Sequence, residues 1–180
     1  TTELFNAVRK VIDNKNLISR MGFWFKVELN KEYESQGWKI HVSATLDNYI
    51  DILGAVAKTC EELRASFKFI RDTRLFKYIN GKQMHRGGSC KFIAIYPIDS
   101  EHFLLLLEEL YKKLRNYQGP YILSDMRYKD CRVLYYRYGE KKSKLYLNSN
   151  NEFDRYLVAP DKSLYLEERK PYYNLPYWVD

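Results

Sequence analysis

Residues 37–44 read GWKIHVSA, and the fold is best approached from this stretch. Apolar and polar residues alternate along it, which is typical of a β-strand with one buried face. The alternation places Lys39 and His41 on one face and Ile40 and Val42 on the other. Two basic side chains two residues apart indicate either an exposed strand or a site that binds an anion.

The length and composition predict one globular domain. The chain has 180 residues, of which 46% are hydrophobic, so it can bury a core and is not disordered. Its longest apolar run, residues 103–110 (FLLLLEEL), contains glutamates and is too short to span a bilayer. The first residues lack the pattern of a signal peptide. We therefore expect a cytoplasmic location.

The cysteines predict neither a disulfide framework nor a metal site. Cys60, Cys90 and Cys131 are odd in number and widely spaced, and they form no C-x-x-C pair. Together with the three histidines they make no plausible zinc ligand set. Small, reduced, mostly buried thiols are the simplest interpretation. We expect no metal and no other cofactor.

The net charge predicts an anionic partner. A formal net charge of +7 suits nucleic acid, a phosphorylated substrate or an acidic peptide. The basic residues lie within patterned segments and not in a lysine-rich tail. This distribution favours a basic pocket or face.

Periodicity divides the chain into alternating helices and strands. Helices are expected over residues 3–14, 45–64 (with Thr45 as N-cap), 73–80 and 100–116 (with Ser100 as N-cap). Strands are expected over 22–30, 38–44, 66–71, 91–97, 120–125, 131–139 and 144–149, with a hairpin region at 30–37 and a glycine-containing loop at 81–90. The pattern predicts a single α+β domain with a central, mostly antiparallel or mixed sheet flanked by helices.

The last residues differ in character from the rest. From Pro160 the periodicity is lost, and prolines and aromatic residues increase. We therefore predict that residues 1–159 form the domain and that residues 160–180 form an extended segment leading to another domain.

Further cations lie on separate expected elements. Lys68 lies between Phe67 and Phe69 in SFKFIR and points away from them, while Arg137 lies between tyrosines in CRVLYYRYG. Lys91 begins the strand KFIAIYP after a loop that carries Arg86. A lone lysine on a strand is usually solvated, and a lone histidine is more often structural than catalytic. The residues alone therefore predict an anion-binding α+β domain and no particular reaction.

Several blocks in order extend this prediction. GWKIHVSAT, FKFIR, RGGSCKFIAIYP, GPYILSDMR and YYRYG resemble the N-terminal lyase domain of class III and class IV lanthipeptide synthetases. That domain is related to the phosphothreonine lyase effectors of pathogenic bacteria. The resemblance runs from about Gly22 to Gly139, and the closing residues 168–180 resemble the connector that precedes the kinase domain of class III synthetases.

The resemblance implies a metal-free β-elimination of phosphate from phosphoserine or phosphothreonine. The products would be dehydroalanine and dehydrobutyrine in a precursor peptide made of leader and core. The other implied partners are the adjacent kinase and cyclase domains. Neither a membrane nor nucleic acid is expected as a partner. In such lyases the strand residues matching Lys68, His41 and Lys39 are the base, the acid and the enolate-stabilising cation. The implied phosphate ligands are Arg137, Lys91 and Arg86, and Asp125 orients the cations.

Elementary chemistry is consistent with those roles. A base must be neutral, whereas a free lysine titrates at roughly 10.4. Burial and neighbouring cations lower the pKa of a lysine. Phe67 and Phe69 flank Lys68, and Lys39 and the arginines of the expected site supply the neighbouring positive charge. A phosphate dianion beside a histidine should raise the pKa of that histidine above its usual value of about 6.5, so the ring keeps its proton to higher pH.

Two alternatives remain open at this point. The basic balance and the tyrosines suit a nucleic-acid-binding module, although no RNP-type aromatic motif is present. A catalytically silent domain could bind only the leader peptide, but this chain retains both Lys68 and His41.

Overall fold

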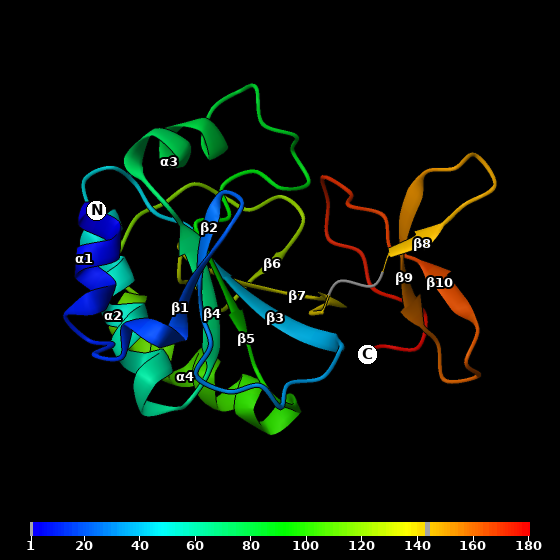
Figure 1. Ribbon diagram of the computed structural model, residues 1–180, viewed down its shortest axis with the longest axis horizontal. Helices are drawn as coiled ribbons and strands as arrows, with labels where there is room; N and C mark the ends of the chain where they lie inside the picture. The colour runs from blue at the N-terminus through cyan, green and yellow to red at the C-terminus, as the bar shows by residue number, and fades with distance from the viewer. Residues whose placement is uncertain (1, 143–144) are drawn as a thin grey trace.

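The computed structural model describes residues 2–142 and 145–180 and confirms an α+β fold. Figure 1 shows helices packed beside a large sheet, with a small separate sheet near the C-terminus. The helices are α1 (Glu3–Arg9), α2 (Tyr49–Glu62), α3 (Thr73–Ile79) and α4 (Ser100–Leu114), with a 3-10 turn at Lys15–Leu17. The strands are β1 (Ile18–Met21), β2 (Trp24–Val27), β3 (Gln36–Val42), β4 (Ser66–Ile70), β5 (Ile93–Tyr96), β6 (Met126–Arg127), β7 (Leu134–Glu140), β8 (Leu145–Leu147), β9 (Phe153–Val158) and β10 (Leu164–Leu166).

The large sheet has seven strands in the order β1-β2-β4-β5-β3-β7-β6. Each pairing between neighbouring strands in the described residues is antiparallel. The stretch GWKIHVSA, residues 37–44, forms most of β3 and lies between β5 and β7. Its position inside the sheet explains why its apolar face is fully buried.

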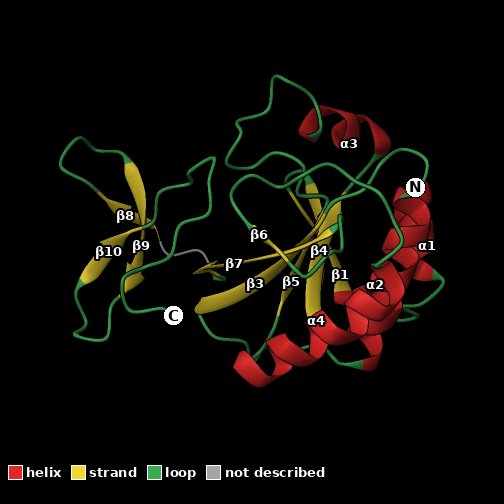
Figure 2. Ribbon diagram, turned by 180° about the vertical axis from the view of Figure 1, so that it is seen from behind, coloured by secondary structure: helices red, strands yellow, loops and turns green. Residues whose placement is uncertain are grey.

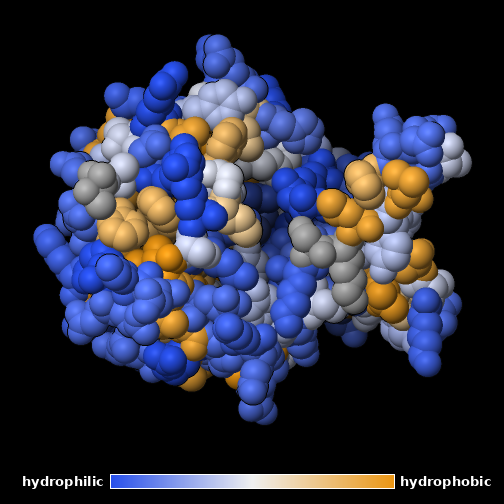
Figure 3. Space-filling view, viewed as in Figure 1, coloured by the Kyte–Doolittle hydropathy of each residue, from blue (hydrophilic) through white to orange (hydrophobic). Residues whose placement is uncertain are grey.

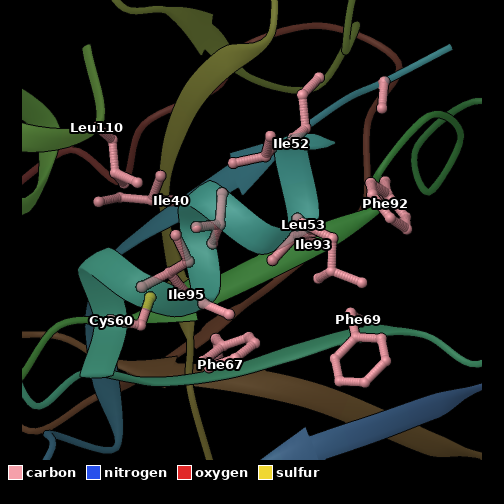
Figure 4. Close-up of a cluster of buried hydrophobic side chains, with 14 of the residues drawn as sticks. Ile40, Ile52, Leu53, Cys60, Phe67, Phe69, Phe92, Ile93, Ile95 and Leu110 are labelled. Atoms are coloured by element: carbon pink, nitrogen blue, oxygen red, sulfur yellow. The ribbon is translucent and has the colours of Figure 1, made fainter. Parts of the chain in front are cut away.

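The two faces of this sheet have different surroundings. Ile40 and Val42 point into a core formed with α2 and α4, where Ile52 and Leu53 of α2 are also fully buried (Figure 4). Burying such a side chain stabilises the fold by roughly 1.5–3 kcal/mol. The alternation of β3 and β4 then turns Lys39, His41 and Lys68 to the opposite face, as predicted.

Some segments near the N-terminus differ from the prediction. The first helix ends at Arg9 and not at residue 14. Gly22, at φ +59°, turns the chain between β1 and β2, and β1 was not predicted. The hairpin expected at residues 30–37 is wrong, because β4 and β5 lie between β2 and β3. A local turn signal cannot show that two later strands will insert between its flanking strands.

Both predicted helix caps are also wrong. The cap of α4 is Asp99, whose carboxylate accepts a hydrogen bond from the His102 amide at 2.8 Å. Helix α2 begins after Asn48, because residues 45–48 form a turn in which the Asn48 side chain accepts from the Thr45 amide.

The strand predicted over residues 120–125 is absent. Its end is a turn in which the Asp125 amide donates to the carbonyl of Ile122, and the strand that follows is only the two-residue β6, which pairs with β7. This turn carries Asp125 behind His41, as described below.

A three-stranded antiparallel sheet, in the order β10-β9-β8, was not predicted (Figure 2). The boundary predicted between residues 159 and 160 falls between β9 and β10. These two strands pair with each other, with Val158 opposite Leu164, so the boundary divides one sheet. Beyond β10 the chain returns toward the large sheet, and the Trp178 ring packs edge-on against Tyr165. The division into a domain and a following segment stays a prediction.

Three other features concern the described residues only. None of their helices has the length and apolar character that crossing a membrane requires. No three of their His, Cys, Asp and Glu side chains lie close enough to hold a metal ion together. The thiols of Cys60 and Cys131 are buried, and that of Cys90 is partly exposed.

Candidate active site

A pocket of about 250 Å³ lies on the face of the large sheet that the helices leave free. Figure 3 shows a hollow between the larger body and the smaller lobe, with strongly hydrophilic residues on the side of the smaller lobe. The pocket brings together basic side chains from five segments of the chain, namely Lys39, His41, Lys68, Lys91, Arg137 and Arg169. Its apolar wall includes Trp24 and Phe23 of the β1–β2 hairpin. This composition suits a small, highly charged anion attached to a larger molecule.

Strand register explains why these side chains meet. Lys39 of β3 lies directly opposite Arg137 of β7, so both point to the same face. Ala94 of β5 lies opposite His41 on one side and opposite Lys68 on the other. Because alanine has only a methyl group, the pocket has an open floor between the imidazole and the ammonium group.

Lys68 has the environment of a lysine base. Its Nζ atom lies 4.3 Å from the centroid of the Trp24 ring. Burial, followed by the charges of Lys39 and Arg169, lowers the pKa of Lys68 to about 7. A substantial fraction of Lys68 is therefore neutral near pH 7, as its proposed role requires.

His41 forms a buried pair with Asp125. The Nδ1 and Oδ2 atoms are 2.5 Å apart, and the Ser124 hydroxyl donates to the other carboxylate oxygen at 2.8 Å. Burial alone would raise the pKa of Asp125, but His41, Lys91 and Ser124 hold it below its usual range. Asp125 is thus ionised and accepts the Nδ1 proton, which leaves Nε2 as the free ring nitrogen.

The pKa of His41 is lowered here, whereas a raised pKa is expected when a phosphate dianion lies beside the ring. In the protein without substrate, burial lowers the pKa of His41 to about 4, although Asp125 opposes the shift. The imidazole is neutral near pH 7 in this state. A dianion in the pocket would raise that pKa by adding negative charge beside the ring.

Two of the remaining pocket cations, Lys91 and Arg137, have specific polar partners. Lys91 donates to the carbonyl of Gly87 at 2.8 Å and lies 4.0 Å from Asp125. Burial lowers its pKa to about 7, against the effect of Asp125. Arg137 is 6% exposed, and its Nη2 atom lies 3.7 Å from a carboxylate oxygen of Glu167. Burial lowers the pKa of Lys39 to about 8, and Glu167 opposes this shift.

The structure therefore gathers most, but not all, of the predicted site residues. Lys39, His41, Lys68, Lys91 and Arg137 line one pocket, and Asp125 supports it from behind. Arg86 lines a neighbouring cavity of about 540 Å³, together with residues of the 81–90 loop and Tyr121. The two cavities share Met84 as a wall.

Three residues near the pocket were missed by the sequence analysis. Trp24 contacts Lys68, Arg169 lines the pocket, and Glu167 contacts Arg137. The last two lie in the segment expected to lead away from the domain. The cluster Glu167-Glu168-Arg169-Lys170 was the available signal, since a linker has no particular need for such charges.

Comparisons with known proteins identify the family of this chain and a solved structure with the same fold. Residues 4–180 match the family described as RamC, N-terminal domain. The probable SapB synthase of Streptomyces coelicolor is 36% identical over 160 residues. That alignment covers 88% of this chain but 17% of the relative, so the chain spans about a sixth of that protein.

One solved structure also shares the fold. It is the phosphothreonine lyase SpvC, an effector protein from Salmonella, which is 15% identical and has a TM-score of 0.51. The match covers 77% of this chain and 76% of SpvC. At this identity the likeness concerns the fold alone. From the family match over nearly its whole length, the chain belongs to the RamC N-terminal domain family.

Proposed function

We propose that this chain is a phosphoserine/phosphothreonine lyase that acts on a phosphorylated precursor peptide in lanthipeptide biosynthesis. The reaction is a metal-free β-elimination that yields dehydroalanine or dehydrobutyrine and inorganic phosphate. One observation carries the proposal: a lysine with a pKa of about 7 and an Asp-paired histidine face one pocket lined by further cations.

The first step is removal of the Cα proton. Neutral Lys68 takes this proton through Nζ, and the electron pair moves toward the adjacent carbonyl oxygen. Lys39 keeps a pKa of about 8, so it is still largely protonated where Lys68 is partly neutral. Its positive charge stabilises the enolate-like oxygen as that charge develops.

The second step is departure of phosphate. The electron pair returns to form the Cα–Cβ double bond, and the Cβ–O bond breaks. The bound phosphate dianion raises the pKa of His41, so the ring takes up a second proton, on Nε2, when the substrate binds. His41 then gives this Nε2 proton to the leaving oxygen, while Asp125 keeps accepting the Nδ1 hydrogen. Arg137, Lys91 and Arg169 bind the phosphoryl oxygens through charge-assisted hydrogen bonds.

A relative in sequence and a protein of the same fold support this proposal. A probable SapB synthase and a protein named as a phosphothreonine lyase share sequence or fold with the chain. We further propose that the peptide partner comprises leader and core, that kinase and cyclase domains adjoin this one, and that it acts in the cytoplasm.

The pocket also distinguishes this function from the alternatives. A module that binds single-stranded nucleic acid uses exposed aromatic platforms along a basic groove. Here Arg137 and Lys91 are buried at 6% and 9% exposure, inside a pocket that suits one phosphoryl group. A domain that only binds a leader peptide has no need for a lysine with its pKa lowered to about 7.

The test is incubation of the protein with phosphoserine and phosphothreonine peptides in the presence of EDTA. Elimination removes the whole phosphoric acid and leaves an alkene, which a thiol traps as a covalent adduct detected by mass spectrometry. Hydrolysis instead restores the hydroxyl and gives no adduct. Recovery of the hydroxyl peptide, or of unchanged phosphopeptide, would overturn the proposed function.

A further inference from the structure

The chain returns to the pocket immediately after β10, in residues 167–169, which form the return segment. The Glu167 amide donates to the carbonyl of Arg155 at 2.8 Å, which ties this return to β9. The Glu167 side chain is 7% exposed, and its carboxylate accepts from the Glu140 amide at 3.2 and 3.3 Å. The same carboxylate lies 3.7 Å from Nη2 of Arg137. It therefore connects the return segment to the end of β7 and to a pocket cation.

Gly139 provides the space for this carboxylate. A Cβ atom at position 139 would lie 2.4 Å from Oε1 of Glu167 and 3.4 Å from Nζ of Lys39. Gly139 does not have a positive φ, so its backbone conformation does not require glycine. The missing side chain instead allows Glu167 to lie close to β7, near both Lys39 and Arg137.

The Glu167 carboxylate affects the pKa values of the two pocket lysines Lys39 and Lys68 differently. It raises the pKa of Lys39 and so opposes the effect of burial on that group. The main influences on Lys68 are burial and the charges of Lys39 and Arg169, all of which lower its pKa. Glu167 thus helps one lysine to keep its proton while the other loses it.

We propose that Glu167 is a positioning residue for the elimination reaction, which orients Arg137 toward the phosphate and maintains the positive charge of Lys39. This inference rests on the proposed lyase function. It makes the return segment part of the active site. Glu167 itself does not touch the reacting atoms; it acts through the two cations of β3 and β7.

The test compares Glu167→Gln with the natural protein over a pH series, using a phosphoserine peptide. We expect kcat/KM to fall about tenfold or more, because Arg137 loses its buried ionic partner. The alkaline limb of the profile should also move to lower pH, by about half to one unit, because Lys39 loses its proton more easily. Glu152→Gln is the matched control, since Glu152 is exposed in the β8–β9 turn and away from the pocket.

A second variant tests the same carboxylate from the other side. Gly139→Ala should displace Glu167 by steric overlap and lower kcat/KM in the same way. The double variant should then be little worse than either single variant, because both changes remove one interaction. Circular dichroism and thermal melting check that each variant is folded.

The outcomes separate this inference from the proposed function. If the natural protein does not eliminate phosphate, the proposed function is wrong. If it does, but Glu167→Gln leaves the alkaline limb unchanged, the positioning role is wrong. Tighter substrate capture with a higher rate would also overturn it, because Glu167 would then compete with phosphate for Arg137. Additive losses in the double variant would indicate two unrelated structural effects.

Discussion

His41 and Lys68 lie on separate strands that both pair with β5 at Ala94. Neighbouring strands are about 4.8 Å apart, so the two backbones are separated by roughly 10 Å across one methyl group. A phosphorylated residue placed over this floor can present its Cα hydrogen to Lys68 and its leaving oxygen to His41. The sheet itself therefore sets the distance between the proposed base and the proposed acid.

Filling that floor should block the substrate. Ala94→Leu adds three carbon atoms where the pocket needs space, and we expect elimination to fall by at least about a hundredfold. The fold should lose about 1–3 kcal/mol, the usual cost of overpacking. Phosphate-release assays and thermal melts measure the two effects. A folded Ala94→Leu protein with nearly full activity would show that the substrate lies elsewhere.

The pH dependence should reflect the two lysines. Lys68 must be neutral to accept a proton, so the rate should rise as pH increases through about 7. It should fall again above about 8, where Lys39 loses its positive charge. Lys68→Ala should abolish elimination at every pH while leaving phosphopeptide affinity within about tenfold. Rapid elimination by a folded Lys68→Ala protein would remove Lys68 from the mechanism.

The role of His41 can be tested with the leaving group. His41→Asn should reduce turnover by about 10²–10⁴ on a phosphoserine peptide, the usual contribution of a general acid. The loss should be much smaller on an O-sulfated serine peptide, because sulfate leaves without a proton. Asp125→Asn should reduce the rate in the same pattern, since it disturbs the Nδ1 hydrogen bond. Equal losses on both substrates would assign His41 to binding.

The phosphate ligands should differ in importance. Arg137→Lys should weaken substrate capture by more than tenfold, because lysine lacks the planar guanidinium whose parallel N–H groups bind two phosphoryl oxygens side by side. Arg86→Ala should have a smaller effect, because Arg86 lines the neighbouring cavity. Inhibition constants for sulfate, together with sulfate-dependent melting, measure capture directly. A nucleic-acid binder would instead lose affinity steeply with salt and show modest losses at each basic position.

Sequence reasoning was most successful where periodicity was strong. The alternation in residues 37–44 correctly separated the Lys39 and His41 face from the Ile40 and Val42 face, because the core buries the apolar side. The same argument correctly turned Lys68 away from its flanking phenylalanines. Periodicity predicts which face a side chain occupies, but not which strands will be neighbours.

The parts that were missed depend on long-range contacts. The insertion of β4 and β5 between β2 and β3 leaves no local signal, so a turn-rich segment was interpreted as a hairpin. The return of Glu167 and Arg169 to the pocket follows from the pairing of β9 with β10 and from the space above Gly139. The sequence of residues 160–180 alone therefore does not predict that Glu167 and Arg169 lie at the pocket.

The return segment also determines when the pocket can be completed during synthesis. Both β3 and β5, which pair with each other, are synthesised well before residues 167–169 exist. Pairing of β3 with β7, almost a hundred residues later in the chain, must follow. A nascent chain therefore contains Lys68, the proposed base, before it contains Glu167 and Arg169. The full set of charged side chains around the pocket exists only once residue 169 has been synthesised.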